Sequence, residues 1–533
     1  MKQNTILTIL VWLIIALGIG LRLDQYFFNR ALWLDEAFFA VNFLHRDFWT
    51  VLQLPLDYSH SHIAPPAFML ITQLSIELFG NFDYILRLYP LICGLLSVIA
   101  FYFLARITVS PIAVPIAVFL FAISDALILY SSDFKQYSSD VFITIGLLWL
   151  AVSWQQLDLT KGRVILLAIL GVVIVWFSHP ATFILASMGS YWGLQLLYQK
   201  QWRQLAILAL IGIAWLISIV TMYKFVSNGG VGSSPIGEWL LIFWDQILHA
   251  FMPNPLTEAG QQWLFDRFTS IFNYPANLGQ ITTTAYIPAI LFLFGCFTLM
   301  VKKQQLLYLS VVPIALTLIL SYLKAYPFAD RLILFLLPIF YLVIAEAIAQ
   351  IQLTIADYPQ QTHKWSTYVL QASLVTLLVY PLGDISKHRQ IQEIKPLMNY
   401  LQAHGQQDKL YLYHWAEPAF RYYAPQYGFD YTSCHLISPI PAKDFIKEID
   451  YYRQKLAMKP VNISETKCIL GAGELFQQSL PDLEKLQGQG RVWFLFTHHS
   501  WQETDLFLSH LDGIGLRLDS QHQPAVDLYL YEL

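Results

Sequence analysis

Two adjacent carboxylates, Asp35 and Glu36, are the first residues of the chain whose types and spacing could support catalysis. They lie in Trp33-Leu34-Asp35-Glu36-Ala37, shortly after the first long apolar run. Charged side chains beside a bilayer are costly unless they are solvated, paired or used. Either carboxylate could act as a general base toward a hydroxyl or as a metal ligand. The structural alternative is a solvated loop, or acidic residues at the start of a helix.

The segment Tyr130–Tyr137 places an acid, an amine and two phenols within one short stretch between apolar runs. Asp133 is a third candidate catalytic carboxylate. Lys135 could bind a substrate phosphate, because charge-assisted hydrogen bonds to anionic oxygens are strong. The alternative is a surface ion pair between Asp133 and Lys135, which would contribute little to stability.

Basic side chains stand at the start of several apolar segments. His60 and His62 precede a proline pair that breaks or begins a helix; they could bind metal or phosphate, or simply lie at the interface. Arg87 and Arg331 could each extend to the membrane surface or hold a lipid phosphate. The candidate substrate- and phosphate-binding residues are His62, Arg87, Lys135, Tyr137 and Arg331.

The composition identifies the elements that must position these residues. Hydrophobic residues make up 56% of the 533 residues, charged residues make up 13%, and the mean hydropathy is +0.49. Soluble domains contain about 25% charged residues. The chain is therefore a membrane protein rather than a disordered one. Its net charge of −4 and the absence of a basic region argue against a nucleic-acid partner.

Charge is unevenly distributed along the chain. Residues 1–383 contain 36 charged side chains, whereas the much shorter stretch 384–533 contains 32. This shift predicts a transmembrane domain over 1–383 and a soluble domain over 384–533. The expected architecture is a polytopic α-helical membrane protein with juxtamembrane helices and a C-terminal α/β domain.

About eleven apolar runs are long enough to cross a bilayer, or nearly so. The first has no small-residue cleavage site and is expected to be a retained anchor rather than a signal peptide. The predicted spans are Thr5–Leu21, Ile85–Ala105, Pro111–Leu129, Ser138–Leu157, Val164–Ser178, Pro180–Tyr198, Gln204–Met222, Tyr286–Val301, Leu306–Leu323, Leu332–Gln350 and Ser366–Leu382.

The apolar run Pro65–Gly80 is short, and the distribution of basic residues decides its placement. If it does not span, the basic turns between the other runs fall on the cytoplasmic side, as the positive-inside rule requires. If it spans, every later basic turn moves outside. We therefore expect a juxtamembrane or re-entrant segment. An odd number of crossings then places Asp384–Leu533 outside the cytoplasm, in a multi-pass protein of the cytoplasmic membrane.

The C-terminal region has an α/β pattern. We expect strands at Lys409–His414 and Arg491–Phe496, and helices at Pro441–Leu456 and Trp501–Leu511. The last two strands should pair, and they are Leu516–Ser520 and Val526–Glu532. Cys434 and Cys468 could form a disulfide if this region is extracytoplasmic, but their spacing alone does not decide it.

Several of these motifs, taken in order, resemble the polytopic C-type glycosyltransferases, specifically the bacterial group of protein-O-mannosyltransferases and aminoarabinose transferases. The resemblance covers about the first 200 residues well, and Pro327–Pro338 and the outer C-terminal domain more loosely. It rests on Trp33-Leu34-Asp35-Glu36-Ala37, His62-Ile63-Ala64-Pro65-Pro66, Leu78-Phe79-Gly80, Arg87-Leu88-Tyr89-Pro90, Cys93-Gly94-Leu95-Leu96-Ser97-Val98 and the segment Tyr130–Tyr137.

The resemblance implies transfer of a sugar from a polyprenyl-phosphate carrier to an acceptor hydroxyl outside the cytoplasm, with inversion. The family's proposed base maps onto Asp35, and a second acidic site residue maps onto Asp133. Related members carry a basic group near the proline pair, where this chain has His62. Lys135 or Arg331 would then contact the carrier phosphate. The acceptor is not specified, and a divalent metal is left open as the one candidate cofactor.

Two other classes of function remain open on the sequence. A transporter or flippase could use the same charged residues only to bind a lipid-linked sugar. Transporters often contain internal repeats and ionisable residues at the bilayer midplane, whereas this chain has no evident repeat and its charges lie near helix ends. A binding subunit is the other alternative, against which the retained Asp35, Glu36 and Asp133 argue.

Overall fold

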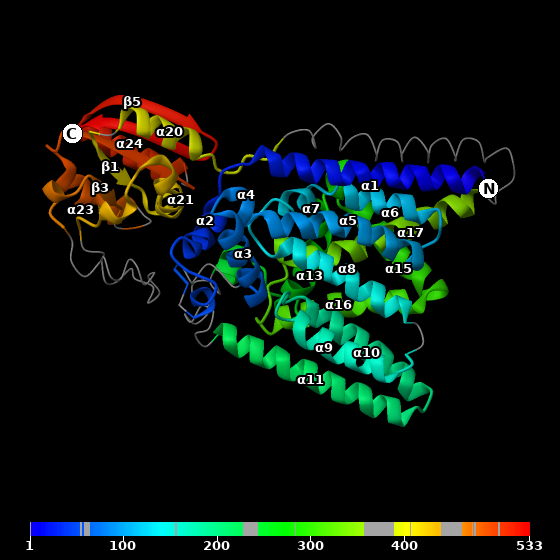
Figure 1. Cartoon of the computed structure of the whole chain (residues 1–533). Coiled ribbons are helices and arrows are strands. Elements are labelled where there is room, and N and C mark those ends of the chain that lie inside the picture. The colour runs from blue at the N-terminus through cyan, green and yellow to red at the C-terminus, as the bar shows by residue number, and fades with distance from the viewer. Residues whose placement is uncertain are drawn as a thin grey trace.

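The computed structural model describes residues 2–53, 56–57, 64–154, 157–227, 243–282, 284–356, 388–405, 407–438, 461–471, 473, 476–498 and 501–533. A bundle of apolar helices occupies one side of the molecule and a small mixed α/β region the other (Figure 1). The end of the bundle next to this region is called the sheet end below. The N-terminus lies at the opposite end of the bundle (Figure 1).

The bundle consists of long apolar helices with short connections. Five segments among the described residues are long and apolar enough to cross a membrane: Leu7–Phe28, Leu88–Thr108, Trp202–Val226, Gln304–Tyr322 and Asp330–Thr354. The helices of the bundle are α1 (Lys2–Phe28), α5 (Leu88–Thr108), α6 (Ala113–Ala122), α7 (Asp125–Tyr130), α8 (Tyr137–Ser153), α9 (Lys161–Ile174), α10 (Ala181–Tyr198), α11 (Trp202–Ser227), α15 (Tyr286–Lys302), α16 (Gln304–Tyr322) and α17 (Leu337–Ala356).

Helix α17 lies at the centre of the bundle. It packs against α15 and α6, and the side chains described along it are largely enclosed by neighbouring helices. The peripheral helices α1, α11 and α15 instead expose large apolar side chains such as Leu13, Leu210 and Ile290. Exposed apolar surface of this extent indicates contact with lipid rather than water.

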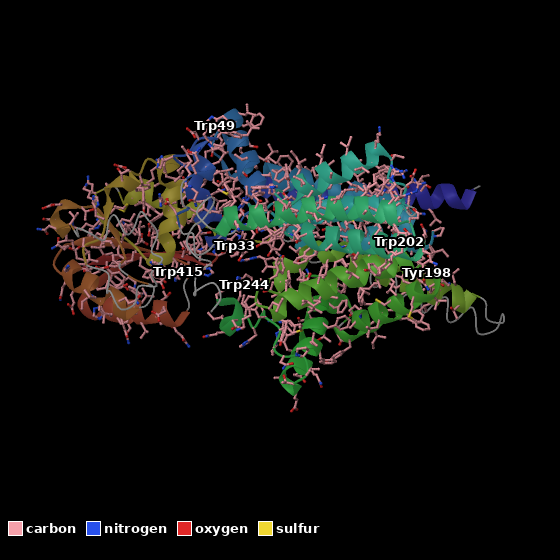
Figure 2. All side chains as sticks on the ribbon, turned by 90° about the horizontal axis from the view of Figure 1, so that it is seen from below. Trp33, Trp49, Tyr198, Trp202, Trp244 and Trp415 are labelled. Atoms are coloured by element: carbon pink, nitrogen blue, oxygen red, sulfur yellow. A yellow bond between two sulfur atoms is a disulfide. The ribbon has the colours of Figure 1, made fainter. Side chains whose placement is uncertain are left out.

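Tryptophan and tyrosine side chains lie near both ends of the bundle, and Tyr198, Trp202 and Trp49 are exposed. Tyr198 and Trp202 lie at the end away from the sheet, whereas Trp33, Trp244 and Trp49 lie toward the sheet end (Figure 2). Tyrosine and tryptophan are enriched at the two membrane–water interfaces, where one edge of the ring is apolar and the other polar. This placement fits a bundle that spans a bilayer lengthwise.

The predicted span Pro111–Leu129 is two helices, α6 and α7, rather than one. The break at Ile123-Ser124 leaves carbonyl groups of α6 without helical partners. The buried guanidinium of Arg22 on α1 satisfies them, donating to Ala122 O at 3.0 Å and Phe121 O at 3.3 Å. Tyr341 donates to Ser124 Oγ at 2.8 Å. A buried side chain from another helix thus stabilises an interruption that hydropathy alone does not reveal.

Short helices form a layer between the bundle and the sheet (Figure 1). They are α2 (Leu34–Ala40), η1 (Val41–Phe43), η2 (Thr50–Leu52), α3 (Pro66–Phe79) and α4 (Asp83–Leu86). Helix α3 has 14 residues, and at 1.5 Å per residue it is only about 21 Å long, short of a bilayer core. Its Gln73 donates to Arg46 O at 2.8 Å. This length and contact favour the juxtamembrane interpretation of Pro65–Gly80.

The remaining helices of the membrane part lie between α11 and α17. They are η4 (Phe243–Ile247), α13 (Glu258–Asn273), α14 (Leu278–Ile281) and η5 (Asp330–Leu336). The 3-10 helix η5 brings Arg331 to the start of α17 and packs against α8. The predicted span Leu332–Gln350 therefore begins as a 3-10 helix before it becomes α-helical.

The C-terminal region contains a six-stranded mixed sheet with the order β2-β3-β1-β4-β6-β5. Its strands are β1 (Lys409–Leu412), β2 (Cys434–His435), β3 (Cys468–Leu470), β4 (Arg491–Thr497), β5 (Leu516–Gln523) and β6 (Val526–Glu532). The first four are parallel, and β6 pairs antiparallel with β4 and β5. The α/β prediction is confirmed, including the terminal strand pair.

Helices cover this sheet and connect it to the membrane part. They are α20 (Lys395–His404), η6 (His414–Ala416), α21 (Glu417–Tyr423), η7 (Ala424–Tyr427), η8 (Tyr431–Ser433), η9 (Ile463–Glu465), α23 (Phe476–Leu486) and α24 (Trp501–Ile514). Helix α24 confirms the helix predicted at Trp501–Leu511. Helix α21 packs directly against α2. The sheet region therefore contacts the loop that carries Asp35 and Glu36.

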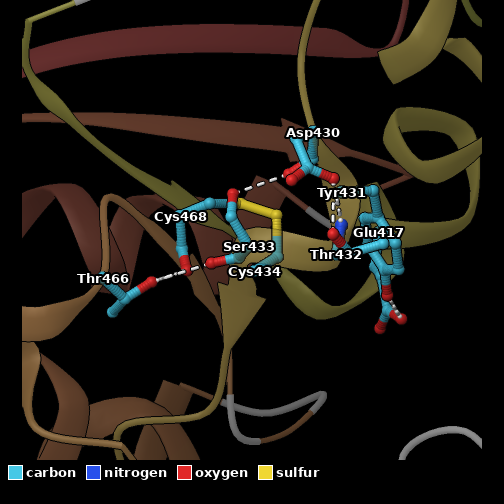
Figure 3. The surroundings of a disulfide bond; sticks show 8 residues. All are labelled: Glu417, Asp430, Tyr431, Thr432, Ser433, Cys434, Thr466 and Cys468. Atoms are coloured by element: carbon cyan, nitrogen blue, oxygen red, sulfur yellow. Dashed lines mark hydrogen bonds between the residues drawn. A yellow bond between two sulfur atoms is a disulfide. The ribbon is translucent and has the colours of Figure 1, made fainter.

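Cys434 and Cys468 form a disulfide (Figure 3). They are register partners on the parallel strands β2 and β3, with Cα atoms 4.3 Å apart. Thr466 Oγ1 donates to Ser433 O at 3.0 Å beside the bond. The pairing that the sequence left open is thus set by the register of two strands separated by 34 residues.

Some predictions fall outside the described residues. These are the span Ser366–Leu382, the helix Pro441–Leu456, the domain boundary at 383/384, and both histidines of the first loop, His60 and His62.

Candidate functional site

The site begins with Glu36, which is fully buried and accepts hydrogen bonds from three segments. Arg30 Nη1 donates to its Oε2 at 2.7 Å. Arg87 donates from Nε at 2.8 Å and from Nη2 at 2.7 Å. The backbone N–H of Phe134 donates to Oε1 at 2.7 Å. Glu36 therefore joins the first loop, the start of α5 and the turn after α7.

Two positive charges determine the ionisation of Glu36. Burial opposes its charged form, but Arg30 and Arg87 outweigh burial and lower the pKa of Glu36 to about 2. A permanently ionised carboxylate with this many donors is a poor proton acceptor at neutral pH. This geometry argues against the expected role of Glu36 as a catalytic acid or base.

Arg87 also directs its guanidinium group to partners inside the protein. Besides its bonds to Glu36, it donates from Nη1 to Arg30 O at 2.7 Å and from Nη2 to Ala31 O at 3.2 Å. Its side chain is 2% exposed, so it neither extends along the membrane surface nor presents a free donor to a phosphate. This burial argues against the expected role of Arg87 as a phosphate ligand.

Asp35 points away from this network although it is adjacent to Glu36. Helix α2 begins at Leu34, and successive residues on a helix are rotated by about 100°. Asp35 forms an ion pair with Arg331 of η5, and the two side chains are 18% and 21% exposed. The Arg331 guanidinium also stacks over the Trp33 ring, 5.3 Å from its centroid. This pair is accessible to a ligand, whereas Glu36 is not.

Asp133 lies behind this pair, buried in the turn between α7 and α8. Its Oδ1 is 3.7 Å from Arg30 Nη2, and neither carboxylate oxygen makes a regular hydrogen bond. Burial and the nearby charge of Glu36 raise the pKa of Asp133 to about 7. A carboxyl group that titrates near neutrality can exchange a proton with a substrate or a neighbour.

Lys135 and Tyr137 complete the cluster. The Lys135 ammonium lies 5.6 Å from the centroid of the Phe39 ring and interacts electrostatically with Asp35 and Asp133. Burial lowers the pKa of Lys135. Tyr137 packs edge to face on Tyr130, with ring centroids 5.1 Å apart. The alternative of a solvent-exposed Asp133–Lys135 pair is wrong, because both side chains are buried.

The structure therefore brings together most of the predicted site residues at the sheet end of the bundle. The members of this cluster, called the charged cluster below, are Arg30, Asp35, Glu36, Arg87, Asp133, Lys135, Tyr137 and Arg331. Arg30, which was not among the predicted site residues, is 1% exposed and contacts both Glu36 and Asp133. Its position in the same loop, six residues before Glu36, was the available signal.

Metal binding was left open, and the described residues contain no group of three or more His, Cys, Asp or Glu side chains that could hold a metal ion. The two histidines of the first loop lie outside those residues. The charged cluster itself mixes carboxylates with arginines and a lysine. In such a mixture, the cations can bind an anionic substrate and a carboxylate can accept a proton from a hydroxyl group.

Comparison with known proteins gives a fold relationship. No protein-family model and no curated protein sequence matches the chain. The crystal structure of ArnT from Cupriavidus metallidurans bound to undecaprenyl phosphate superposes with a TM-score of 0.52 at 13% identity, covering 98% of this chain and 97% of that chain. The apo state of the same protein gives a TM-score of 0.51 at 12% identity, covering 97% of each chain.

The chain has the fold of ArnT, a C-type glycosyltransferase. The fold expected from the resemblance is thereby confirmed over nearly the whole chain, including the C-terminal region. A more distant likeness is to the oligosaccharyltransferase AglB from Archaeoglobus fulgidus in complex with an inhibitory peptide and a dolichol-phosphate, with a TM-score of 0.45 at 13% identity, over 77% of this chain and 63% of that chain.

Proposed function

We propose that this protein is a membrane glycosyltransferase that moves a sugar from a polyprenyl-phosphate carrier to an acceptor hydroxyl at the outer face of the cytoplasmic membrane. The observation that carries the proposal is the accessible Asp35–Arg331 pair beside Lys135, at one end of an apolar bundle. A carboxylate next to two cations provides a base for the acceptor and counter-ions for a phosphate leaving group.

The proposed reaction is a single displacement with inversion. Asp35 accepts the proton of the acceptor hydroxyl as its oxygen forms the new bond to the anomeric carbon. The bond from that carbon to the phosphate oxygen breaks, and polyprenyl phosphate leaves. Arg331 and Lys135 stabilise the charge that develops on the phosphate. When the donor phosphate binds Arg331, it takes the place of Asp35 in the ion pair and leaves that carboxylate available as a base.

The buried residues of the charged cluster have different proposed roles. Glu36 and Arg87 fix the positions of the first loop and of the turn after α7, since their hydrogen bonds cross these segments. Asp133 is proposed as the second acidic residue of the reaction, buried behind the Asp35–Arg331 pair and able to hold a proton near neutral pH. Tyr137 is proposed to line the donor site.

The membrane arrangement is part of the same proposal. Eleven spans within 1–383 would leave 384–533 as an extracytoplasmic domain. The disulfide supports an oxidising compartment for this region. The structure of ArnT bound to undecaprenyl phosphate is a further reason to choose a polyprenyl-phosphate donor.

The test is to compare wild type with Asp35→Asn in detergent. Both proteins receive a membrane-lipid extract that contains labelled polyprenyl-phosphate sugars and acceptors, and loss of label from the carrier is followed. Removal of an essential base lowers the rate about 100-fold or more. Asp47→Asn is the matched control, because Asp47 is a solvent-exposed aspartate of the same loop that only caps a turn at Thr50.

The outcomes separate the candidate functions. Release by wild type and by Asp47→Asn, but not by Asp35→Asn, would support the transferase, and the labelled product would identify the acceptor. Binding of the carrier without turnover by all three proteins would favour a transporter, flippase or binding subunit. Normal turnover by Asp35→Asn would remove Asp35 from the proposed base role.

A further inference from the structure

The segment Asn29–Leu32, immediately before the Asp35 helix, is held from two sides. On the membrane side, Arg87 donates to the carbonyls of Arg30 and Ala31. On the other side, residues of the C-terminal region bond the N–H groups of Ala31 and Leu32 and the carbonyl of Asn29. Ala31 and Leu32 are buried, so the partners of their N–H groups determine where the segment can lie.

Three side chains from the C-terminal region make these bonds. The Glu393 carboxylate accepts from Ala31 N at 3.2 and 3.3 Å. Tyr423 Oη accepts from Leu32 N at 2.9 Å. Lys395 Nζ donates to Asn29 O at 2.9 Å. These contacts join residues more than 350 positions apart in the sequence, at the segment that precedes the proposed base.

The same side chains are anchored to the membrane part through Asp83 of α4. Tyr423 Oη donates to Asp83 Oδ2 at 2.8 Å, and Lys395 Nζ lies 2.5 Å from the same oxygen. Tyr423 is fully buried. Its hydroxyl therefore uses both its donor and its acceptor capacity at once, which fixes the distance between α4 and the first loop.

Little chain lies between these bonds and Asp35. Helix α2 begins at Leu34, and the intervening Trp33 supports the Arg331 guanidinium. Helix α2 also packs on α21, the helix that ends at Tyr423. A shift of the Leu32 backbone is therefore transmitted to the Asp35–Arg331 pair rather than absorbed by a flexible linker.

We propose that Tyr423 and Glu393 of the C-terminal region are positioning residues of the transfer reaction, because they fix the backbone that places Asp35 against Arg331. The expected change in transfer rate rests on the proposed function, whereas the expected change in amide hydrogen exchange does not. It makes the C-terminal region a part of the catalytic site's support rather than only a domain that recognises the acceptor.

The first experiment measures backbone amide hydrogen exchange in the peptide that covers Ala31 and Leu32. Tyr423→Phe removes the acceptor for Leu32 N and keeps the ring, so exchange there should be about tenfold faster, the effect of one lost hydrogen bond. Tyr422→Phe is the matched control, because its hydroxyl donates to Asn81 Oδ1 at 3.0 Å and does not touch this segment. Equal exchange in the two variants would overturn the proposal even if no transfer activity exists.

The second experiment measures sugar transfer. A misplaced base lowers the rate without weakening donor binding, so Tyr423→Phe should lower kcat about 10- to 100-fold and leave the KM for the donor unchanged. Glu393→Ala should behave similarly, and Glu393→Gln should restore activity because its amide oxygen still accepts from Ala31 N. In an Asp35→Asn background, Tyr423→Phe should cause no further loss.

These outcomes separate positioning from simple destabilisation and from failure of the proposed function. A loss of kcat that is equal in Tyr422→Phe, or that persists fully in the Asp35→Asn background, would show that Tyr423 does not act through Asp35. If wild type transfers no sugar but the exchange difference is present, the proposed function fails while the structural link stands.

Discussion

At the scale of single residues, two neighbouring carboxylates have opposite environments. Glu36 is enclosed by two guanidinium groups and is ionised at every physiological pH. Asp35 instead forms an ion pair with Arg331, and both side chains are partly exposed. A buried charge with several partners stabilises geometry, because removing one partner would leave an uncompensated charge. An accessible carboxylate can release its cation when a ligand binds, and a catalytic base must be able to do this.

Asp133 gives a residue-scale prediction about pH. It faces Glu36, Arg30 and Arg87, and its pKa is raised to about 7 from an unfolded value of about 3.9. Between these values the folded state binds the proton and the unfolded chain does not, so stability falls as pH rises from about 4 to about 7. Asp133→Asn should remove the part of this fall that Asp133 contributes.

The measurement is thermal denaturation in detergent at pH 5 and pH 8. Asp133→Asn should have a higher Tm than wild type at pH 8, by a few degrees at about 2–4 °C per kcal/mol, and a smaller difference at pH 5. Asp47→Asn serves as the comparison, since Asp47 is exposed and hydrogen bonds from Thr50 and Trp49 lower its pKa rather than raise it. A difference of the same size at both pH values would contradict the titration of Asp133.

At the scale of elements, the packing of α1 on α6 shows how closely the bundle is assembled. A Cβ atom at Gly18 would lie 2.8 Å from Ala122 Cβ and 3.1 Å from Ala122 Cα. Arg22, one turn later on α1, bonds the carbonyls at the end of the same helix α6. Small residues allow helices in membranes to approach this closely, and the approach brings Arg22 within reach of the broken helix.

Gly18→Ala should therefore destabilise the bundle by about 1–3 kcal/mol, the usual cost of overpacking. Gly20→Ala on the same helix is the control, because a Cβ there meets nothing within 4 Å. Thermal stability of the two variants, followed by size-exclusion chromatography in detergent after heating, checks the difference. An equal Tm for the two variants would show that α1 and α6 are not in this contact.

At the scale of the whole molecule, the sheet region and the proposed active site lie at the same end of the bundle. The aromatic side chains at the two ends of the bundle and the disulfide in the sheet region are consistent with one orientation in the membrane. If the sheet end faces outward, as proposed, the short helices α2, α3 and α4 would lie at the outer interface, where a lipid-linked donor and a water-soluble acceptor can meet.

Reporter fusions test this orientation. A reporter enzyme that is active only outside the cytoplasm should be active when fused after Leu533, and inactive when inserted after Gln201, in the turn between α10 and α11. The basic residues around that turn, Lys200 and Arg203, predict its cytoplasmic location. Activity at both positions, or at neither, would contradict the proposed number of spans.

The sequence by itself determined the membrane class, most of the helices, the α/β character of the C-terminal region and the short list of acids and bases. Apolar periodicity and length are local properties, so a single chain reveals them. The break between α6 and α7 was not predicted, because its stabilising partner, Arg22, lies about 100 residues away. The disulfide remained open for the same reason, since strand register is a tertiary property.

Only the tertiary structure decided which acidic residue is accessible and which is enclosed. Asp35 and Glu36 are adjacent in sequence, and their different roles arise because one faces Arg331 and the other faces Arg30 and Arg87. The support from Tyr423 likewise depends on a contact across 391 positions. Charge pairing and hydrogen bonding act over a few ångströms in space, and sequence distance carries no information about which charges meet.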